Sequence, residues 1–309
     1  MRNFSITKTL LFLIFILTSI GNSQERFYLP GNSRGEIIHH SEISLSYVEE
    51  HEQAEWVAYK LTKAMIDSGY VSRTNRFKRD DSVSTSSAHP DDYKYSGYDR
   101  GHLCPAGDMK HSEIAMQESF LMSNISPQIP SFNRNTWKRL EDRVRVWAVE
   151  NDSLIIIVGG VLEDSLKKIG TDSAISVPNY FYKVILNNLF QKEKMIGFLF
   201  PNKSTNAIIA SFAVTVDSIE ILTGLDFFPF LPDSIEDKLE SQINHASWTF
   251  KEEKTNRNKE SQQIPTDRTI SESDSNGDPN QCKAITKKGT RCTRRATTED
   301  GYCYQHKPK

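Results

Sequence analysis

Cysteine, long apolar runs and an excess of charge of either sign are all scarce in this chain of 309 residues. Four cysteines are too few for a small domain held together by disulfides, and three of them lie near the carboxyl terminus. Lys and Arg number 38 against 40 Asp and Glu, and this balance argues against nucleic-acid binding through a generally basic surface. Hydrophobic residues make up 37% of the chain, which suffices for a core and excludes collagen-like and wholly disordered classes.

One apolar run is suited to a targeting segment, and it lies at the amino terminus. Arg2 and Lys8 precede the run LLFLIFIL at 10–17, and small residues follow as far as Ser23. This layout is typical of a secretory signal peptide. An uncleaved anchor is the alternative, but the run is shorter than the ~20 residues that a membrane-spanning helix needs. We therefore expect residues 1–23 to be removed and the mature protein to be exported, extracellular or periplasmic, without stable membrane association.

Composition divides the rest of the chain into three segments. Residues 24–250 carry periodic apolar patterns, whereas 251–281 contain two Ile as their only strongly apolar residues and are predicted to be a disordered linker. Residues 282–309 form a small separate unit. The segment 24–250 has 23 Lys and Arg against 31 Asp and Glu, and the terminal unit has 8 against 2. An acidic body is thus expected to carry a basic tail.

Two helices are predicted within the body from local patterns. Apolar residues at helical spacing predict a helix over 54–65, which Gly69 can end. Asp217 followed by Glu220 is typical of a capping box and predicts a short helix through Leu222.

Three strands are predicted from runs of apolar and β-branched residues. They lie at 154–158, 181–186 and 195–200, with a break at the glycine pair 159–160 and an end at Pro201. No internal repeat is visible. Strands and helices mixed without strict βαβ alternation favour the α+β class.

Positive charge in the body is concentrated in two clusters, at 73–79 and at 134–145. Between them stand the motifs DRGH at 99–102 and NISPQ at 124–128. A single Arg is best interpreted as a solvated surface charge. A His, two Asn and a Glu flanked by both clusters are harder to explain as surface residues and mark a candidate functional site.

Asn133, Trp137, Glu141 and Arg145 recur every four residues, so on a helix they share one slowly drifting face. Amide and carboxylate oxygens are hard donors that suit a hydrated Mg²⁺ held beside a phosphate. Because eight helical residues span about 12 Å, Asn133 and Glu141 cannot both ligate one ion directly. Either one acts through water, or Asn133 lies at the frayed start of the helix. An amphipathic surface helix with Trp137 in the core explains the spacing equally well.

Taken together, DRGH at 99–102, NISPQ at 124–128 and the N-x7-E pattern of 133–141 resemble the signature of the DNA/RNA non-specific endonucleases. That family includes mitochondrial endonuclease G and secreted bacterial nucleases. The similarity extends over about residues 43–245 and includes 55–59, which is similar to an early helix of the family. The resemblance implies an α+β fold of the ββα-metal type, with a central mixed or antiparallel sheet and flanking helices. The small carboxy-terminal module is expected in addition to this fold.

The resemblance also implies roles at the reacting centre. His102 would be the general base that deprotonates the attacking water. Asn133 would ligate Mg²⁺ directly, with Mn²⁺ as an alternative, and Glu141 would hold metal-bound waters. Asn124 would orient the site, and Asp99 would hold the site residues in position without itself contacting the metal or the substrate.

Arginines would bind the substrate phosphate in this scheme. Arg100 and Arg145 would clamp the phosphate through their forked guanidinium groups. A further family arginine precedes DRGH, and Arg73 and Arg76 both compete for that place.

The predicted function is that of a secreted, Mg²⁺-dependent nuclease that cleaves DNA and RNA internally, without regard to sequence, to 5′-phosphate products. The alternative is a nucleic-acid-binding protein that keeps the fold with weak or no turnover. The presence of His102, Asn133 and Glu141 together disfavours that alternative. The oligomeric state is open, and a homodimer is compatible with the sequence.

The terminal unit has a metal-ligand pattern of its own. Cys282, Cys292, Cys303 and His306 form C-x9-C-x10-C-x2-H, which matches a closed structural Zn²⁺ site. Disulfides are the alternative in an exported protein, but three cysteines would leave one unpaired, which favours Zn²⁺. The basic residues of the unit could tether the enzyme to nucleic acid.

Overall fold

The computed structural model describes residues 28–171, 174–187, 193–250, 283 and 301. The chain divides into two compact units, Met1–Lys251 and Glu252–Lys309, and all helices and strands below belong to the first. None of the helices in these described ranges is long and apolar enough to cross a membrane. The predicted signal peptide at 1–23 and the predicted linker at 251–281 lie outside the described residues.

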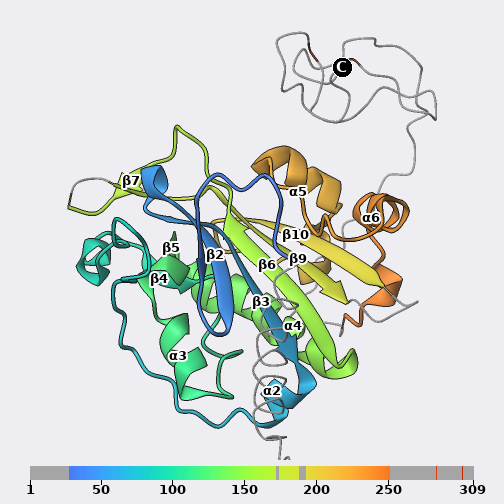
Figure 1. The fold of residues 1–309 in the computed structure, drawn as a ribbon, viewed down its shortest axis with the longest axis horizontal. Helices are drawn as coiled ribbons and strands as arrows, with labels where there is room; N and C mark the ends of the chain where they lie inside the picture. The colour runs from blue at the N-terminus through green and yellow to red at the C-terminus, as the bar shows by residue number, and fades with distance from the viewer. Residues whose placement is uncertain (1–27, 172–173, 188–192, 251–282, 284–300, 302–309) are drawn as a thin grey trace, which may run out of the picture. The chain divides into compact units, whose positions relative to one another are not determined.

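A seven-stranded antiparallel sheet forms the centre of the first unit (Figure 1). In spatial order its strands are β1 (Glu36–His39), β2 (Ile43–Val48), β3 (Gln53–Thr62), β6 (Ser153–Gly160), β9 (Tyr180–Asn187), β10 (Lys194–Pro201) and β11 (Ala213–Val214). Two small antiparallel pairs accompany it, namely β4 (Asp99–His102) with β5 (Ile125–Gln128), and β7 (Lys168–Ile169) with β8 (Ile175–Ser176). The predicted α+β class is confirmed, and of the two forms expected for the sheet the antiparallel one is found.

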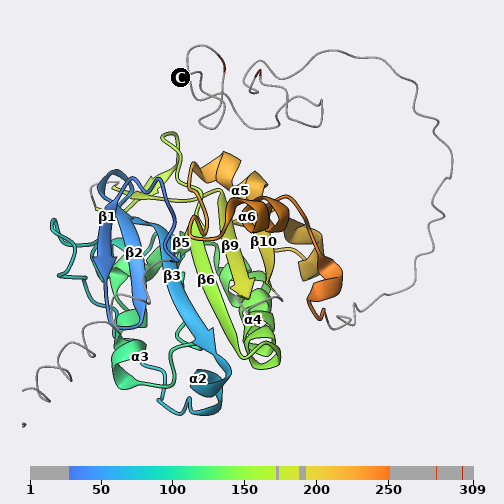
Figure 2. The same cartoon turned by 45° about the vertical axis from the view of Figure 1, so that its right-hand side comes forward.

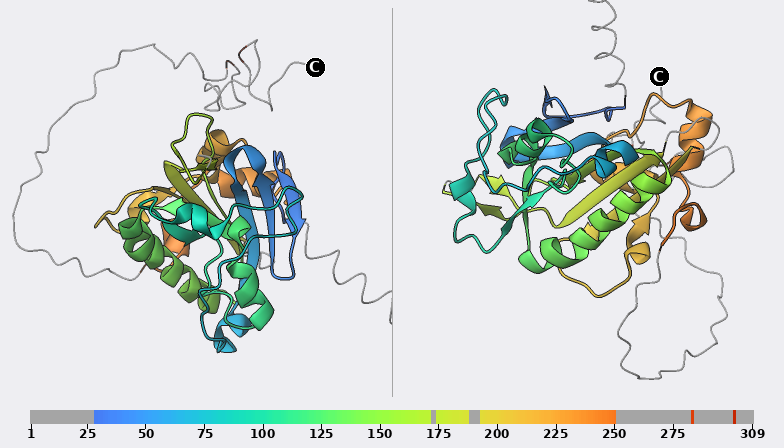
Figure 3. Two further views of the ribbon diagram at one scale, coloured as in Figure 1. Left: turned by 90° about the vertical axis from the view of Figure 1, so that its left-hand side faces the viewer. Right: turned by 90° about the horizontal axis from the view of Figure 1, so that it is seen from below.

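Helices lie on both faces of this sheet. The α-helices are α2 (Lys63–Asp67), α3 (Glu113–Ser119), α4 (Lys138–Glu150), α5 (Val216–Thr223) and α6 (Asp233–Glu240). Shorter 3₁₀ segments are η1 (Glu49–His51), η2 (Pro90–Tyr93), η3 (Met122–Asn124), η5 (Ile209–Phe212) and η6 (His245–Ser247), and η4 (Phe132–Trp137) is a π-helical turn. Figure 3 shows α4 running along the sheet, and Figure 2 shows α5 and α6 together beside β10.

Each face of the sheet buries a separate apolar cluster. Leu140, Val144 and Trp147 of α4 pack against one face, whereas Val216 and Ile219 of α5 pack against the other. Burying a large apolar side chain stabilises a fold by about 1.5–3 kcal/mol. The two clusters therefore fix α4 and α5 firmly on opposite sides of the sheet.

The three predicted strands are confirmed as β6, β9 and β10, but the glycine pair does not break the first. Gly159 and Gly160 are the last two residues of β6. A Cβ at Gly159 would lie 2.0 Å from the Glu55 carbonyl oxygen and 2.6 Å from the Tyr182 hydroxyl. Glycine is needed there because neighbouring strands approach closely, not because the chain turns.

The predicted helix over 54–65 is wrong. Residues 53–62 form β3, a central strand with apolar neighbours on both faces, and only Lys63–Asp67 form a helix. A strand buried on both faces is apolar at nearly every position, so a helical spacing can be found in it by chance. The segment 55–59, which is similar to an early family helix, is therefore strand.

The short helix predicted near Asp217 is confirmed as α5, but its capping box is not. Thr215 is the N-cap, and its hydroxyl oxygen accepts a hydrogen bond from the Ser218 backbone N–H at 3.2 Å. Asp217 and Glu220 therefore lie inside the helix. Gly224, with φ of 75°, ends it in the left-handed conformation.

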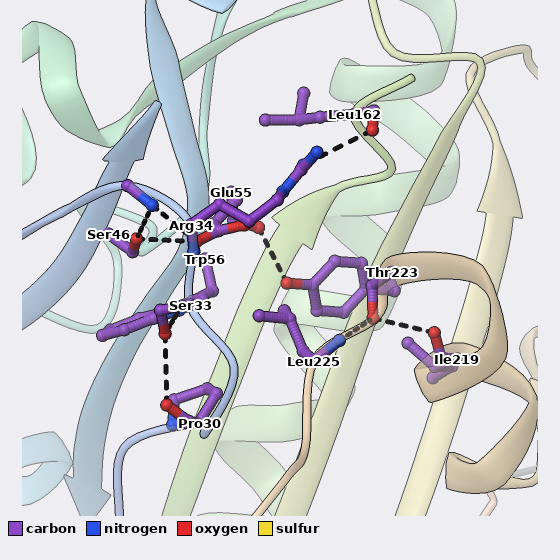
Figure 4. A network of polar contacts seen from close by, with 12 residues as sticks. Pro30, Ser33, Arg34, Ser46, Glu55, Trp56, Leu162, Ile219, Thr223 and Leu225 are labelled. Atoms are coloured by element: carbon purple, nitrogen blue, oxygen red, sulfur yellow. Dashed lines mark hydrogen bonds and ion pairs between the residues drawn. The ribbon is translucent and has the colours of Figure 1, made fainter. Parts of the chain in front are cut away.

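Glu55 fastens the segment before β1 to the centre of the sheet (Figure 4). The register between β2 and β3 shifts at Ser46/Tyr47, and Glu55 is the extra residue of this bulge. Its Oε1 accepts hydrogen bonds from the backbone N–H of Arg34 at 2.7 Å and from the Ser46 hydroxyl at 2.7 Å. A buried carboxylate thus satisfies donors that two separate segments present to it.

Asp80 holds the long connection between α2 and η2 against η3. Its Oδ2 accepts hydrogen bonds from His40 Nε2 at 2.8 Å and from the Ser123 hydroxyl at 2.5 Å, and the Ser82 backbone N–H donates to Oδ1 at 3.0 Å. Burial by itself would raise the pKa of Asp80, but the bonds from His40 and Ser123 prevail and hold that pKa below its usual range.

We expect Asp80→Asn to lower the free energy of unfolding by about 2–4 kcal/mol at pH 7, because the buried donors lose their ionic acceptor. Since the folded-state pKa of Asp80 is depressed, its contribution is complete above the ordinary carboxyl pKa and is lost as pH falls through the folded-state value. Urea unfolding at pH 7 and pH 3 measures both effects. The matched control is Asp81→Asn at the exposed neighbouring position, and equal losses in both variants would contradict the assignment.

Candidate active site

The strand pair β4–β5 and the helix α4 form a ββα unit that carries the sequence motifs. DRGH is strand β4 itself, and NISPQ begins at the end of η3 and continues as β5. In the register of the pair, Asp99 lies opposite Gln128 and His102 opposite Ile125. A Cβ at Gly101 would lie 2.3 Å from the Gln128 side chain, so the glycine of DRGH lets the two motifs meet.

A cavity of about 330 Å³ opens between β4, the loop that follows it and α4. Six of the predicted site residues line it, namely Arg73, Arg100, His102, Asn133, Glu141 and Arg145. Lys110, Arg134 and Lys138, which were not predicted as site residues, line it as well. The lining therefore holds six Lys and Arg side chains and a single carboxylate, which favours an anionic ligand.

His102 lies at the inner end of β4 within an aromatic pocket. Its ring centroid is 4.8 Å from that of Phe120 in a T-shaped contact and 5.5 Å from that of Phe77. Burial, followed by the positive charge of Arg73, lowers the pKa of His102 to about 3. Its Nε2 is buried without a hydrogen-bond partner among the described residues. The imidazole is therefore neutral at pH 7, and Nδ1 is the nitrogen left to face the cavity that His102 lines.

Asn124 does not line this cavity but supports the backbone next to His102. Its Oδ1 accepts a hydrogen bond from the Cys104 N–H at 2.9 Å, and its Nδ2 donates to the carbonyls of Cys104 at 2.9 Å and Ser119 at 2.8 Å. The Leu103 N–H in turn donates to the Asn124 carbonyl at 2.9 Å. The amide side chain thus holds the turn after DRGH, which is an orienting position.

Asn133 enters the cavity from the π-helical turn η4. The Lys138 backbone N–H donates to the Asn133 carbonyl, five residues back, so the turn is wider than that of an α-helix. Asn133 and Glu141 are consequently not on one regular helix, although both line the cavity. The expected frayed start of the helix is instead this ordered π-helical turn.

Asp99 orients Asn133 from outside the cavity. Asn133 Nδ2 donates to Asp99 Oδ2 at 2.9 Å, and Arg134 binds both oxygens of Asp99 at 2.6 and 2.8 Å. Because the side-chain nitrogen Nδ2 of Asn133 is bound to Asp99, the side-chain oxygen Oδ1 is the atom left to face the cavity. This oxygen and the Glu141 carboxylate form a donor set that fits a hard divalent cation.

Burial and nearby charges act together on the carboxyl group of Glu141. Burial raises its pKa, Lys183 lowers it and Asp108 raises it, and the resulting pKa is about 7. Lys183, on β9, is fully buried, with its Nζ 5.0 Å from the centre of the Trp137 ring. Sequence reasoning missed Lys183, although a lone lysine within the apolar strand YFYKVILN was a signal that could have shown it.

Arg145 is bound to two carboxylates in addition to lining the cavity. Its Nη1 donates to Asp108 Oδ1 at 2.6 Å, and Nη2 contacts Asp142. Burial would lower the pKa of Arg145, but the carboxylates of Asp108, Glu141 and Asp142 together outweigh it and the net shift is upward. A Cβ at Gly107 would lie 2.8 Å from Nη1, so a small residue is needed beside the guanidinium.

The remaining predicted arginines separate in position. Arg100 donates from Nε and Nη2 to the Pro90 carbonyl at 3.0 and 2.6 Å and stacks on Phe77. Arg73 lies over the Phe120 ring and lines both this cavity and a neighbouring groove, whereas Arg76 lines only the groove. Of the two competing arginines, Arg73 is thus the one beside His102. The predicted ligands Cys282, Cys292, Cys303 and His306 lie outside the described residues.

The chain is similar to known proteins in both sequence and fold. The model of the DNA/RNA non-specific endonuclease family matches residues 21–234, and that of a domain of unknown function matches residues 279–308. Among solved structures, a chain of the EndoG/EndoGI complex, solved for the mechanism of EndoG inhibition, superposes with a TM-score of 0.62 at 31% identity. This match covers 69% of this chain and 93% of that chain.

Three curated relatives are nucleases by name. A nuclease of Nostoc sp. is 30% identical over 219 residues, which cover 66% of this chain and 77% of the relative. The mitochondrial nuclease EXOG of Danio rerio is 34% identical over 222 residues, covering 67% and 64%. The mitochondrial nuclease 1 of Schizosaccharomyces pombe is 33% identical over 189 residues, covering 55% and 59%. The chain therefore spans slightly less than two thirds of the two mitochondrial relatives.

These relatives overturn one prediction. The amino-terminal segment was expected to direct export, extracellular or periplasmic, but the Danio rerio and Schizosaccharomyces pombe relatives are mitochondrial nucleases. The export prediction is contradicted by these relatives and is withdrawn as wrong. A positively charged start followed by an apolar run does not by itself distinguish between destinations.

The hydrogen bonds of Asn124 lead to a prediction about stability. Asn124→Ala is expected to lower the free energy of unfolding by about 2–4 kcal/mol, because the variant leaves the buried Cys104 and Ser119 backbone groups without partners. Urea unfolding followed by circular dichroism measures the loss. Asn135→Ala, at an exposed position of η4, is the control. A loss in Asn124→Ala no larger than in the control would contradict the supporting role.

Proposed function

We propose that the cavity beside His102 cleaves DNA and RNA internally in a Mg²⁺-dependent reaction. The chain belongs to the DNA/RNA non-specific endonuclease family and is therefore a phosphodiester hydrolase. The observation that carries the proposal is the meeting of three kinds of group in one cavity. A neutral imidazole, a pair of hard oxygen donors and several guanidinium groups all line it. Phosphodiester hydrolysis needs a base, charge neutralisation and phosphate binding, and these groups supply all three.

The donor set fits Mg²⁺. Asn133 would hold the ion directly through its carbonyl oxygen, and Glu141 would hold it through water. A bound Mg²⁺ supplies Lewis-acid stabilisation of the charge that develops around phosphorus and on the leaving oxygen. The hydrogen bond from Asn133 Nδ2 to Asp99 supports this assignment, because it fixes which end of the amide meets the cavity.

His102 accepts the proton of the attacking water in this proposal. In the tautomer that this role requires, the hydrogen is on Nε2, which is buried without a partner among the described residues, and Nδ1 keeps its lone pair for the water. The low pKa of about 3 keeps the ring unprotonated in the free enzyme. A phosphodiester in the cavity adds negative charge, which raises this pKa and strengthens the base when substrate is bound.

Arginine side chains bind and orient the phosphodiester. Arg73, Arg100 and Arg145 line the cavity, and two of them are held in place by stacking on Phe120 and Phe77. Guanidinium groups bind phosphate oxygens in a fork and carry no information about base identity. Broad activity on DNA and RNA, with 5′-phosphate products, is what such a site would produce.

His102→Ala is the sharpest variant for this proposal. We expect cleavage of plasmid DNA and of RNA to fall by roughly 10²–10⁴-fold, because the attacking water loses its base. Binding of a fluorescent duplex in EDTA should be unchanged, because His102 makes no phosphate contact in the scheme. The control is His245→Ala, at an exposed histidine of η6.

Two outcomes separate the possibilities. Undiminished cleavage by His102→Ala would remove His102 as the base. Binding without detectable cleavage by the wild-type protein would instead favour a nucleic-acid-binding protein that has kept the fold.

A further inference from the structure

A second group of acidic side chains lies on the sheet face opposite α4. Asp217 and Glu220, one helical turn apart on α5, meet Glu240 at the end of α6. One carboxylate oxygen from each of the three lies within 4.8 Å of the other two. Both helices pack against β10, so the group is separated from the candidate active site by the thickness of the sheet.

This carboxylate group is buried to an unusual degree. Glu220 is 5% exposed and Glu240 is 4% exposed. Glu220 Oε1 accepts a hydrogen bond from the Phe227 backbone N–H at 2.9 Å. Glu240 Oε1, by contrast, is buried with no hydrogen-bond partner among the residues that the structure describes. A buried carboxylate oxygen without a partner costs considerable free energy unless a cation or a proton compensates it.

The surrounding charges increase this cost. Burial, followed by the charges of Glu220, Glu236, Asp217 and Asp226, raises the pKa of Glu240 to about 10. Glu240 is also the last residue of α6, where the helix dipole disfavours a negative charge. A cation bound to this carboxyl group would offset both its burial and the unfavourable helix dipole.

We propose that Asp217, Glu220 and Glu240 form a second, structural cation site, distinct from the active site, and that its ion is Ca²⁺. The donors are all hard carboxylate oxygens, and one of the three residues, Glu240, has a buried oxygen with no hydrogen-bond partner among the described residues.

The number of protein carboxylates selects the ion. Ca²⁺ takes about six to eight oxygen ligands in a flexible geometry, and several of these can be carboxylates. Mg²⁺ demands a rigid octahedron, keeps several waters and is usually bound by one or two carboxylates. Three carboxylates whose oxygens lie within 4.8 Å of one another therefore suit Ca²⁺ better. Binding joins α5 to α6 and so stabilises their packing on β10.

The experiment uses the full-length protein, stripped with EDTA and returned to metal-free buffer, with Ca²⁺ as the probe. Thermal unfolding is followed as Ca²⁺ is added, in the wild-type protein and in Asn133→Ala, which lacks the direct donor of the active site. We expect Ca²⁺ at 100 times its Kd to raise the Tm of both by about 5–10 °C. Mg²⁺ at the same concentration should raise the Tm of Asn133→Ala by less.

Glu240→Gln should lose the Ca²⁺-induced rise in Tm. Without metal, the same variant should melt close to the wild-type temperature, because a raised pKa leaves the Glu240 carboxyl neutral, as glutamine is. The two proteins therefore separate only on addition of Ca²⁺, whereas a merely structural glutamate would lower the Tm of the variant with and without metal. Asp237→Asn, an exposed carboxylate on the same helix, is the matched control and should keep the full rise.

Asp217→Asn, at a less buried position, provides a second variant if Glu240→Gln does not fold, and it too should lose the rise. A rise in Tm that survives in the folded variants would overturn the proposal. So would the absence of a rise in the wild-type protein. An equal rise with Mg²⁺ in Asn133→Ala would overturn the assignment to Ca²⁺.

Discussion

The buried carboxylate of Asp108 connects the parts of the molecule that the candidate active site depends on. One of its oxygens accepts a hydrogen bond from the Tyr59 hydroxyl on the central strand β3 at 2.9 Å. The other binds Arg145 of α4 at 2.6 Å. Asp108 itself stands in the loop that follows His102, so sheet, loop and helix meet at a side chain that is 2% exposed. Removing one partner of Asp108 would leave a buried charge uncompensated, and this would strongly lower the free energy of unfolding.

The same group of charges sets the electrostatics of the cavity. Asp108 neutralises part of the charge of Arg145 and at the same time raises the pKa of the neighbouring Glu141, while the buried Lys183 lowers it. The cavity lining keeps an excess of positive charge, which favours phosphate. At the same time, the ion pair between Arg145 and Asp108 holds helix α4 in place. The Arg145–Asp108 contact therefore contributes both to the stability of the fold and to the charge of the cavity.

Local chemistry could be predicted from the sequence, and long-range contacts could not. The strands at 154–158, 181–186 and 195–200 were predictable because they are apolar runs bounded by turns. The same property misled the prediction at 54–65, because a strand buried on both faces also satisfies a helical spacing. The six cavity residues that the motifs indicated do come together. Asp108 and Lys183 were missed because their partners are distant in the chain, and their roles depend on burial that no spacing reveals.

The wider architecture explains why the two sheet faces differ. One face carries α4 and the ββα unit, where the buried Asp108 is paired with Arg145. The opposite face carries α5 and α6, where acidic side chains meet one another.

The central claim is that metal-dependent cleavage occurs at the cavity beside His102, and metal add-back to the stripped protein tests it most directly. EDTA-treated protein would be incubated with supercoiled plasmid and with a structured RNA, with and without Mg²⁺, and the new ends would be analysed for 5′-phosphate. The account predicts cleavage of both substrates only when Mg²⁺ is present, with 5′-phosphate and 3′-hydroxyl ends. Cleavage that persists without metal, or that leaves 5′-hydroxyl ends, would contradict it.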